Sequence, residues 1–174
     1  MHGRGPGIAS ACLGLALAAL LATSSPTLGQ SASDKDSDGP FTGLAIITDD
    51  LKWYKLFESP KTPVLSVKDV FGPNERGALA LIFSNAQPRN GVVKIECDVT
   101  AFDPRGKKLI VDDGACYDGP FYGENILVPA LLDLQFETSK EDPAGRAGFT
   151  VTMHDVHSGR KVKLTVAYEL EAGK

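Results

Sequence analysis

The sequence VKIECDVTA, residues 93–101, alternates apolar and polar side chains at every position. Its odd-numbered residues are Val, Ile, Cys, Val and Ala, and its even-numbered residues are Lys, Glu, Asp and Thr. Successive side chains of a β-strand point to opposite faces of the sheet, so one face of this segment would be apolar and the other polar. The pattern therefore predicts a strand that lies between a core and solvent.

The same period of two recurs along the chain. Turn sequences such as Asn90-Gly91 and Asp103-Pro104-Arg105-Gly106 separate the alternating segments. A short helical candidate, residues 49–57, interrupts them, and an aspartate at its start could cap the first turn. Further strands are predicted over residues 43–48, 64–69, 79–83, 108–112, 126–129, 132–136, 149–153 and 162–170.

Short strands with regular turns predict one all-β domain over residues 43–174, built as a sandwich or a barrel of about seven to nine strands. Several strands are apolar on one face and charged on the other. This favours an antiparallel β-sandwich, in which two sheets share one core.

The last part of the chain resembles the closing hairpin of bacterial immunoglobulin-like modules. The turn Asp142-Pro143-Ala144-Gly145 precedes strand residues 149–155, and a second strand follows Ser158-Gly159. The resemblance covers about 30 residues, and it departs from the family in the displaced aromatic Phe149 and in the lack of a Cys-Trp-Cys pattern across the core. It implies an immunoglobulin-like sandwich, a fold that more often binds, scaffolds or assists assembly than catalyses.

The first 29 residues have the three-part layout of a secretory signal peptide. A short basic start precedes the apolar run IASACLGLALAALLA, residues 8–22, and small polar residues follow. We expect cleavage after Gly29, with Ser31 as the second choice and an uncleaved anchor as the alternative. The protein would then be periplasmic or secreted, and residues 30–42 would form a flexible polar lead-in.

Cleavage would leave 145 residues with 17 basic and 22 acidic side chains. This mild acidic balance argues against nucleic acid or an anionic membrane as a partner, and no later stretch is apolar enough for a stable membrane span. Cys97 and Cys116 are the cysteines that remain, and an even count in an exported chain predicts a disulfide. Two buried free thiols are the alternative.

Aromatic residues gather in two segments without a strand pattern. Tyr117, Phe121 and Tyr122 lie among Gly, Pro and acidic residues in a predicted loop, and Trp53 and Tyr54 lie in the helical candidate. Loops on rigid β-scaffolds often carry recognition, so we predict these five residues as the binding surface. The alternative is that both groups close the ends of the sandwich.

Two groups of residues could bind a metal. Asp34, Asp36 and Asp38 form the D-x-D-x-D-G opening of a calcium loop, but Ala45 stands where the loop needs a glutamate. His154 and His157 are the other candidates, yet the first lies on the polar face of a strand and the second in a turn. We therefore favour a solvated linker and surface histidines, and we expect no metal or other cofactor.

The sequence has neither a G-x-S-x-G elbow nor a glycine-rich phosphate loop between a strand and a helix. We therefore expect a non-enzymatic exported protein that binds another envelope or extracellular protein or assists envelope assembly. A periplasmic protein that binds copper, zinc or calcium is the alternative. A hydrolase that uses His154 or His157 with a serine such as Ser66 or Ser84 is the third hypothesis.

Overall fold

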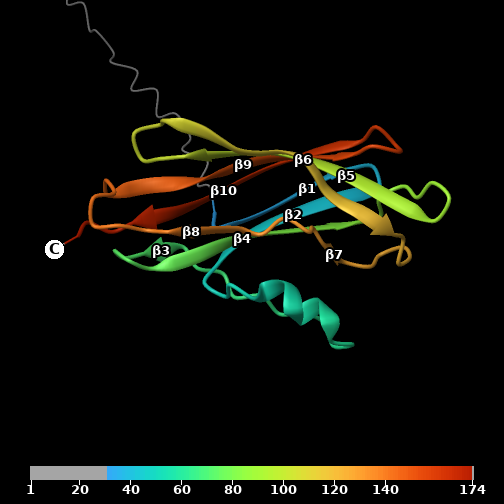
Figure 1. Ribbon diagram of the computed structural model, residues 1–174, viewed down its shortest axis with the longest axis horizontal. Helices are drawn as coiled ribbons and strands as arrows, with labels where there is room; N and C mark the ends of the chain where they lie inside the picture. Colours follow the sequence, from blue (N-terminus) through green and yellow to red (C-terminus); the bar gives the residue numbers. More distant parts are fainter. Residues whose placement is uncertain (1–30, 174) are drawn as a thin grey trace, which may run out of the picture.

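Ten strands and one short 3-10 helix make up residues 31–173, the part of the chain that this computed structural model describes (Figure 1). The predicted signal peptide, residues 1–29, lies outside the described residues. No helix in the described part is long and apolar enough to cross a membrane. The elements are β1 (Ser33–Asp38), β2 (Phe41–Thr48), η1 (Trp53–Glu58), β3 (Val70–Phe71), β4 (Arg76–Ser84), β5 (Val92–Phe102), β6 (Lys108–Pro120), β7 (Val128–Pro129), β8 (Leu134–Glu137), β9 (Gly145–Asp155) and β10 (Lys161–Leu170).

The strands form two sheets. In the first sheet, β1 pairs with β2 and β2 with β4, while β7 and β8 pair with successive parts of β4. In the second sheet the order is β3-β10-β9-β5-β6. All of these pairings are antiparallel except that of β3 with β10. The all-β prediction is therefore confirmed, although the described residues hold ten strands where about seven to nine were expected.

The two sheets pack on one apolar core. On β5 the odd-numbered residues Val93, Ile95, Cys97 and Val99 are buried, as their alternation predicts. They join one cluster with the inward side chains of β2, β4, β9 and β10. The hydrophobic effect of this shared interior holds the sheets together.

Strand β4 is buried on both faces. Leu79, Leu81 and Phe83 point into the core between the sheets, while Ala78 and Ala80 belong to a second apolar cluster on the outer face of the first sheet. Helix η1 supplies Trp53 to this second cluster, and the helix lies below the first sheet in Figure 1. The short side chains of the two alanines let a helix lie close to the sheet, which explains the nearly continuous apolar run of β4.

Residues 33–42 correct the prediction of a flexible lead-in. They form β1 and the start of β2, and β1 pairs with β2 along its whole length. The prediction failed because β1 has no apolar side chains, so neither composition nor periodicity marks it as a strand. A second correction concerns residues 64–69, which form no strand; only Val70 and Phe71 pair, as β3.

The carboxylates of β1 bind the backbone of β10 in the other sheet. Asp38, Asp36 and Asp34 accept hydrogen bonds from the amides of Lys161, Lys163 and Thr165, at 3.0, 2.8 and 2.8 Å. These three amides point away from β9, so without the carboxylates they would form an open sheet edge. We call this set of contacts the aspartate ladder.

Two backbone carbonyls extend the aspartate ladder along β10. The amide of Ala167 donates to the carbonyl of Ser31 at 3.0 Å, and the amide of Glu169 donates to that of Asp69 at 2.8 Å. Each alternate amide of β10 from residue 161 to residue 169 therefore has an acceptor. The ladder satisfies one edge of the second sheet and joins it to the first sheet.

Cys97 of β5 and Cys116 of β6 form a disulfide, with 5.6 Å between their Cα atoms. Cys116 is the extra residue of a β-bulge, because Ala115 pairs with Glu96 and Tyr117 pairs with Ile95. A bulge lets two consecutive residues face the same side of a sheet, and both Cys116 and Tyr117 are buried here. The predicted pairing of the two cysteines is confirmed.

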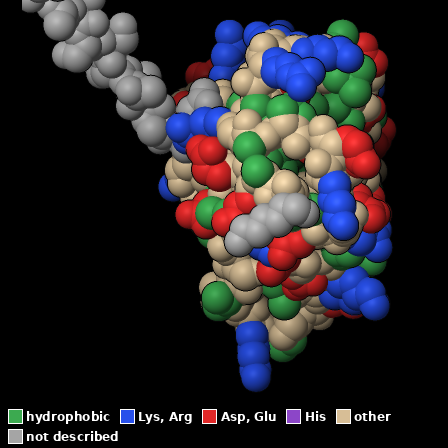
Figure 2. All heavy atoms as spheres, turned by 90° about the vertical axis from the view of Figure 1, so that its left-hand side faces the viewer, with side chains coloured by type: hydrophobic (Ala, Val, Ile, Leu, Met, Phe, Trp, Pro, Cys, Tyr) green, Lys and Arg blue, Asp and Glu red, His purple; other side chains and the backbone are tan. Residues whose placement is uncertain are grey.

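The end of the sandwich near the C-terminus carries both signs of charge. Figure 2 shows acidic and basic side chains interspersed across the middle of this face. This end of the molecule is therefore of mixed charge, in keeping with the small net charge of the chain, −4.

We predict that Asp36→Ala lowers the free energy of unfolding by about 1 kcal/mol, because the amide of Lys163 loses its acceptor. Asp36→Asn keeps an acceptor oxygen and should cost less. Lys35→Ala, on the opposite face of the same strand, should change the stability little. Urea denaturation of the three variants measures the effect, and equal losses for Asp36→Ala and Lys35→Ala would contradict the ladder's contribution.

We predict that replacing both cysteines with alanine lowers the free energy of unfolding by roughly 3 kcal/mol, because the bridge closes a loop of about 20 residues in the unfolded chain. Reducing agent should destabilise the natural protein by a similar amount and leave the double variant unaffected. Intact-mass measurement should give a value about 2 Da below that of the reduced chain. Two alkylatable thiols in the untreated protein would rule the bridge out.

Candidate functional site

A groove of about 610 Å³ opens between η1 and the segment of residues 126–133 that contains β7. In Figure 1 these two parts lie on the lower side of the molecule. Residues from η1, the end of β6, the connection to β7 and the connection to β8 line it. They are Trp53, Tyr54, Phe57, Glu58, Tyr117, Tyr122, Ile126, Leu127, Val128, Pro129, Ala130, Leu131, Leu132 and Asp133.

The inner wall of the groove consists of buried aromatic rings. Trp53 is 2 % exposed, and its ring meets those of Tyr54 and Phe57 edge to face. Tyr117 is 5 % exposed, its ring contacts Phe83, and its hydroxyl donates to the carbonyl of Pro120 at 2.8 Å. Burial raises the pKa of Tyr117 to about 12, so its phenol stays protonated at neutral pH. These two rings shape the wall and offer little surface to a ligand.

The rim of the groove carries the surface that a partner could contact. Tyr122 is 64 % exposed and Leu131 is 73 % exposed, and Tyr54, Ile126 and Leu127 are each more than two-fifths exposed. Large apolar side chains gathered at one exposed place often mark an interaction site, whereas single ones need no explanation. The rim therefore presents aromatic and branched side chains suited to an apolar segment.

Two carboxylates, Glu58 and Asp133, also line the groove. Neither has a Lys, Arg or His partner within ion-pair distance in residues 31–173, although Asp133 accepts hydrogen bonds from the side-chain amide of Gln135. An apolar surface flanked by free acids is suited to an apolar segment that also carries a basic residue. None of the described lining residues is a histidine, serine, cysteine or lysine.

The structure brings together four of the five predicted binding residues. Trp53, Tyr54, Tyr117 and Tyr122 all line the groove, although the two pairs lie more than 60 positions apart in the chain. Phe121 does not line it, and its ring packs against the core instead. Their role in binding stays a prediction.

The predicted loop over residues 116–125 is partly wrong. Strand β6 continues to Pro120, so the irregular segment begins at Phe121. The sequence reasoning also missed Ile126, Leu127 and Leu131, because residues 126–129 were predicted as a strand and Leu131 was left between this strand and the next. Only Val128 and Pro129 of this run pair with β4. Pro129 within an apolar run was the signal that could have shown its irregularity.

The aspartates of the calcium-loop candidate, Asp34, Asp36 and Asp38, lie within strand β1 rather than in a loop. Their carboxylates accept the hydrogen bonds of the aspartate ladder. His154 lies opposite Glu96 on the neighbouring strand, with 3.7 Å between Nδ1 and Oε2. Within residues 31–173, no group of three or more His, Cys, Asp or Glu side chains is arranged to hold a metal.

The turn between β9 and β10 depends on a buried carboxylate. Asp155 is completely buried, and it accepts hydrogen bonds from the amide of Gln87, the amide of His157 and the hydroxyl of Ser158. These bonds tie the turn to the segment that follows β4. His157 thus lies in a turn whose polar contacts are structural.

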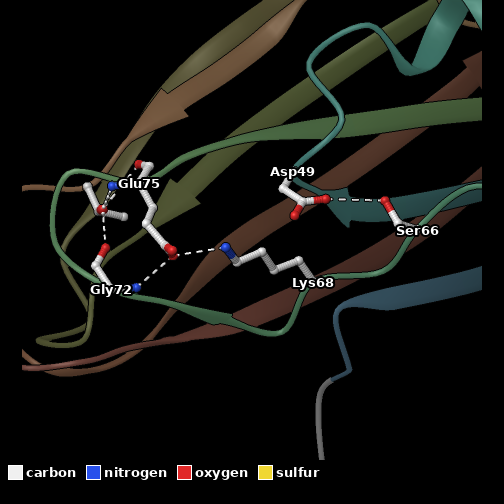
Figure 3. Close-up of polar contacts among 6 residues, drawn as sticks. Asp49, Ser66, Lys68, Gly72 and Glu75 are labelled. Atoms are coloured by element: carbon white, nitrogen blue, oxygen red, sulfur yellow. Dashed lines mark hydrogen bonds and ion pairs between the residues drawn. The ribbon is translucent and has the colours of Figure 1, made fainter.

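Polar contacts also order the segment between η1 and β4 (Figure 3). The hydroxyl of Ser66 donates to Asp49 at 3.3 Å and shares a hydrogen bond with Thr48, so the hydrogen-bond partners of this candidate nucleophile include no histidine. The carboxylate oxygen Oε2 of Glu75 accepts hydrogen bonds from the ammonium of Lys68 and from the backbone amide of Gly72, each at 2.9 Å. The hydrogen bond from Lys68, followed by that from Gly72, lowers the pKa of Glu75.

No family model matches the chain, and no curated protein matches it. Among solved structures, it is similar to an alkylpurine DNA glycosylase, AlkC, of Pseudomonas fluorescens bound to DNA containing an abasic site analog, with 12 % identity over 82 % of this chain and 31 % of that one, at a TM-score of 0.38. It is also similar to a family 123 glycoside hydrolase from Clostridium perfringens, with 6 % identity over 75 % of this chain and 27 % of that one, at a TM-score of 0.37. The chain thus spans less than a third of either protein, and neither likeness assigns it to a family.

Proposed function

We propose that this chain is an exported, non-enzymatic binding protein with an immunoglobulin-like fold. Its groove beside η1 receives an apolar segment of another envelope or extracellular protein, and that segment carries a basic residue next to its apolar side chains. The observation that carries the proposal is the exposed rim, in which Tyr54, Tyr122 and Leu131 surround one groove next to Glu58 and Asp133.

The strand order supports the immunoglobulin-like assignment. An immunoglobulin domain places strands A, B and E in one sheet and strands C, F and G in the other. Strands β2, β4 and β8 correspond to the first set by order and pairing, and β5, β9 and β10 correspond to the second. The hairpin of β9 and β10 is also the segment whose sequence resembles the closing hairpin of the bacterial modules. The disulfide differs, since it joins neighbouring strands of one sheet.

Two features support export. The leader pattern of residues 1–29 is that of a signal peptide, and a disulfide persists in oxidising compartments such as the periplasm or the cell exterior. A binding role agrees with the lining of the groove, because none of its described residues is a histidine or a nucleophilic serine or cysteine. No observation on the described residues favours the metal-binding alternative.

Export predicts a specific N-terminus. The protein recovered from outside the cytoplasm should begin at Gln30, because signal peptidase cleaves after small residues such as Gly29. N-terminal sequencing measures this directly. A start at Ala32 would move the cleavage site to the second choice, after Ser31, and a start at Met1 would contradict export by a cleaved leader.

Binding at the groove is tested by site-directed photocrosslinking in the native envelope. A benzoylphenylalanine placed at Tyr122 or at Leu131 should capture one and the same protein, because both side chains are exposed on the rim. The same probe at Val64, which is 83 % exposed and lies outside the groove, is the matched control and should capture nothing specific.

Substitution should then weaken the captured interaction. Tyr122→Ser combined with Leu131→Ser should raise the dissociation constant about tenfold or more, since exposed aromatic and aliphatic anchors dominate such interfaces. Val64→Ser should leave it unchanged. Capture that is equal at all three probe positions, or affinity that the double substitution does not alter, would contradict the groove as the binding site.

A further inference from the structure

The groove runs along the whole length of η1. Trp53 is the first residue of this helix and Glu58 is the last, and both line the groove. Strand β7, which belongs to the other wall, lies close to η1 (Figure 1). A 3-10 helix rises about 2 Å per residue, so the six residues of η1 form a wall about 12 Å long. The groove therefore suits a short stretch of a partner chain.

The wall opposite η1 offers no free amide to a further strand from residue 128 to residue 131. Val128 and Ala130 direct their amides to β4, and the amide of Ala130 donates there at 2.8 Å. The amide of Leu131 donates to a carbonyl of β6 at 2.7 Å, and Pro129 has no amide hydrogen. A partner segment therefore cannot extend the sheet at this wall, because strand addition depends on main-chain hydrogen bonds.

The length of the wall favours an extended segment over a helix. An α-helix rises 1.5 Å per residue, so about eight residues would pass η1 and only two or three of them would face the groove. A polyproline II segment rises about 3.1 Å per residue with three residues per turn, so about four residues would pass η1. The first and the fourth of these residues face the same way. Two prolines three positions apart would therefore both contact the groove.

The aromatic side chains of the groove are suited to prolines. Tyr54 and Tyr122 are exposed on the rim, and Phe57 is half-buried beside them. Grooves lined by aromatic rings recognise polyproline II segments, which are already extended before they bind. Such a segment loses little conformational entropy on binding, so a short contact can suffice.

The base of the groove also offers a hydrogen-bond donor. The indole N–H of Trp53 has no acceptor among residues 31–173. Among the buried and half-buried residues of that part, Nε of Arg146 is the one side-chain nitrogen or oxygen that is closed to solvent without a hydrogen-bond partner. The indole nitrogen of Trp53 is therefore not closed to solvent, and Trp53 lines the groove. The carbonyls of a polyproline II backbone have no internal partners, so one of them can accept this N–H.

Two carboxylates favour a cationic side chain beside the prolines. Glu58 ends η1 and Asp133 lies on the facing wall, and neither has an ion-pair partner in the described part of the chain. An arginine can form two parallel hydrogen bonds with a carboxylate and can also stack on an aromatic ring, whereas a lysine acts as a point charge. The lining of acids and aromatic rings therefore suits arginine better.

We infer that the groove binds a proline-rich segment in the polyproline II conformation. Two prolines three positions apart contact the rings of Tyr54, Phe57 and Tyr122, and an arginine beside them pairs with Glu58 or Asp133. This inference rests on the proposed function, because it names the kind of segment that the groove receives.

The first test identifies the captured segment. After photocrosslinking through benzoylphenylalanine at Tyr122 in the native envelope, the joined peptides are sequenced by mass spectrometry. The partner peptide should contain two prolines three positions apart, with an arginine within about three residues, or one turn, of them. A captured peptide without such prolines would overturn the inference and leave the binding role intact. Absence of capture at both Tyr122 and Leu131 would overturn both.

The second test measures the preference for polyproline II with two synthetic peptides of equal length and charge, acetyl-PPLPPR-amide and acetyl-AALAAR-amide. Calorimetry of the exported protein should give a dissociation constant on the order of 100 µM for the proline peptide and a value at least about tenfold higher for the alanine peptide. Trp53 is the only tryptophan of the chain, so its fluorescence should change with the same constant. Equal affinities, or no heat of binding up to about 2 mM proline peptide, would overturn the inference.

The third test concerns the arginine. Glu58→Gln combined with Asp133→Asn should weaken the binding of acetyl-PPLPPR-amide about tenfold and leave that of acetyl-PPLPPQ-amide unchanged, because only the first peptide carries the cation. Asp98→Asn, which removes an exposed carboxylate outside the groove, is the matched control and should alter neither. Equal losses for both peptides, or the same loss in the control, would overturn the pairing of the arginine with these acids.

Discussion

The aspartate ladder connects the two sheets where the hydrophobic core cannot. Core packing holds the inner faces together, but it leaves the amides along the edge of β10 without partners, and an open edge attracts other strands. Asp34, Asp36 and Asp38 give these amides acceptors while their own strand belongs to the opposite sheet. One polar segment thus extends the first sheet and closes the second. The same carboxylates that suggest a calcium loop in the sequence are engaged in this structural role.

The opposite edge of the second sheet is organised differently, and the groove lies beside the later half of its last strand, β6. The disulfide and the bulge at Cys116 hold the later half of β6 and turn Tyr117 inward, where it supports the wall of the groove. Helix η1 forms the facing wall because the alanines of β4 leave room for Trp53 on the outer face of the first sheet. The earlier half of β6 pairs with β5 alone among the described residues, and Leu109, Ile110 and Val111 are exposed there. One strand therefore serves a groove at one end and an open edge at the other.

Periodicity predicted the strands whose two faces meet different surroundings, such as residues 93–101. It failed where burial does not differ between the faces or where apolar residues are absent. Residues 33–38 were missed because none of their side chains is apolar, and the amides that their carboxylates bind lie more than 120 positions away. The aromatic residues of the groove were singled out by composition alone, and nothing in the sequence indicated that Phe121 would turn into the core while its neighbour Tyr122 would turn outward. The exposed rim residues at 126–131 were hidden within an apolar run.

The sequence by itself determined the all-β class and the residues of the central strands, and it predicted the pairing of Cys97 with Cys116. These follow from local alternation and from counting, which need no knowledge of distant neighbours. Only the tertiary structure decided that β1 is a strand, that η1 and residues 126–133 enclose one groove, and that β6 keeps an open edge. Each of these features depends on whether segments far apart in the sequence come close enough to form hydrogen bonds or to pack. Such long-range contacts do not produce a periodic pattern of apolar residues, so the sequence alone does not indicate them.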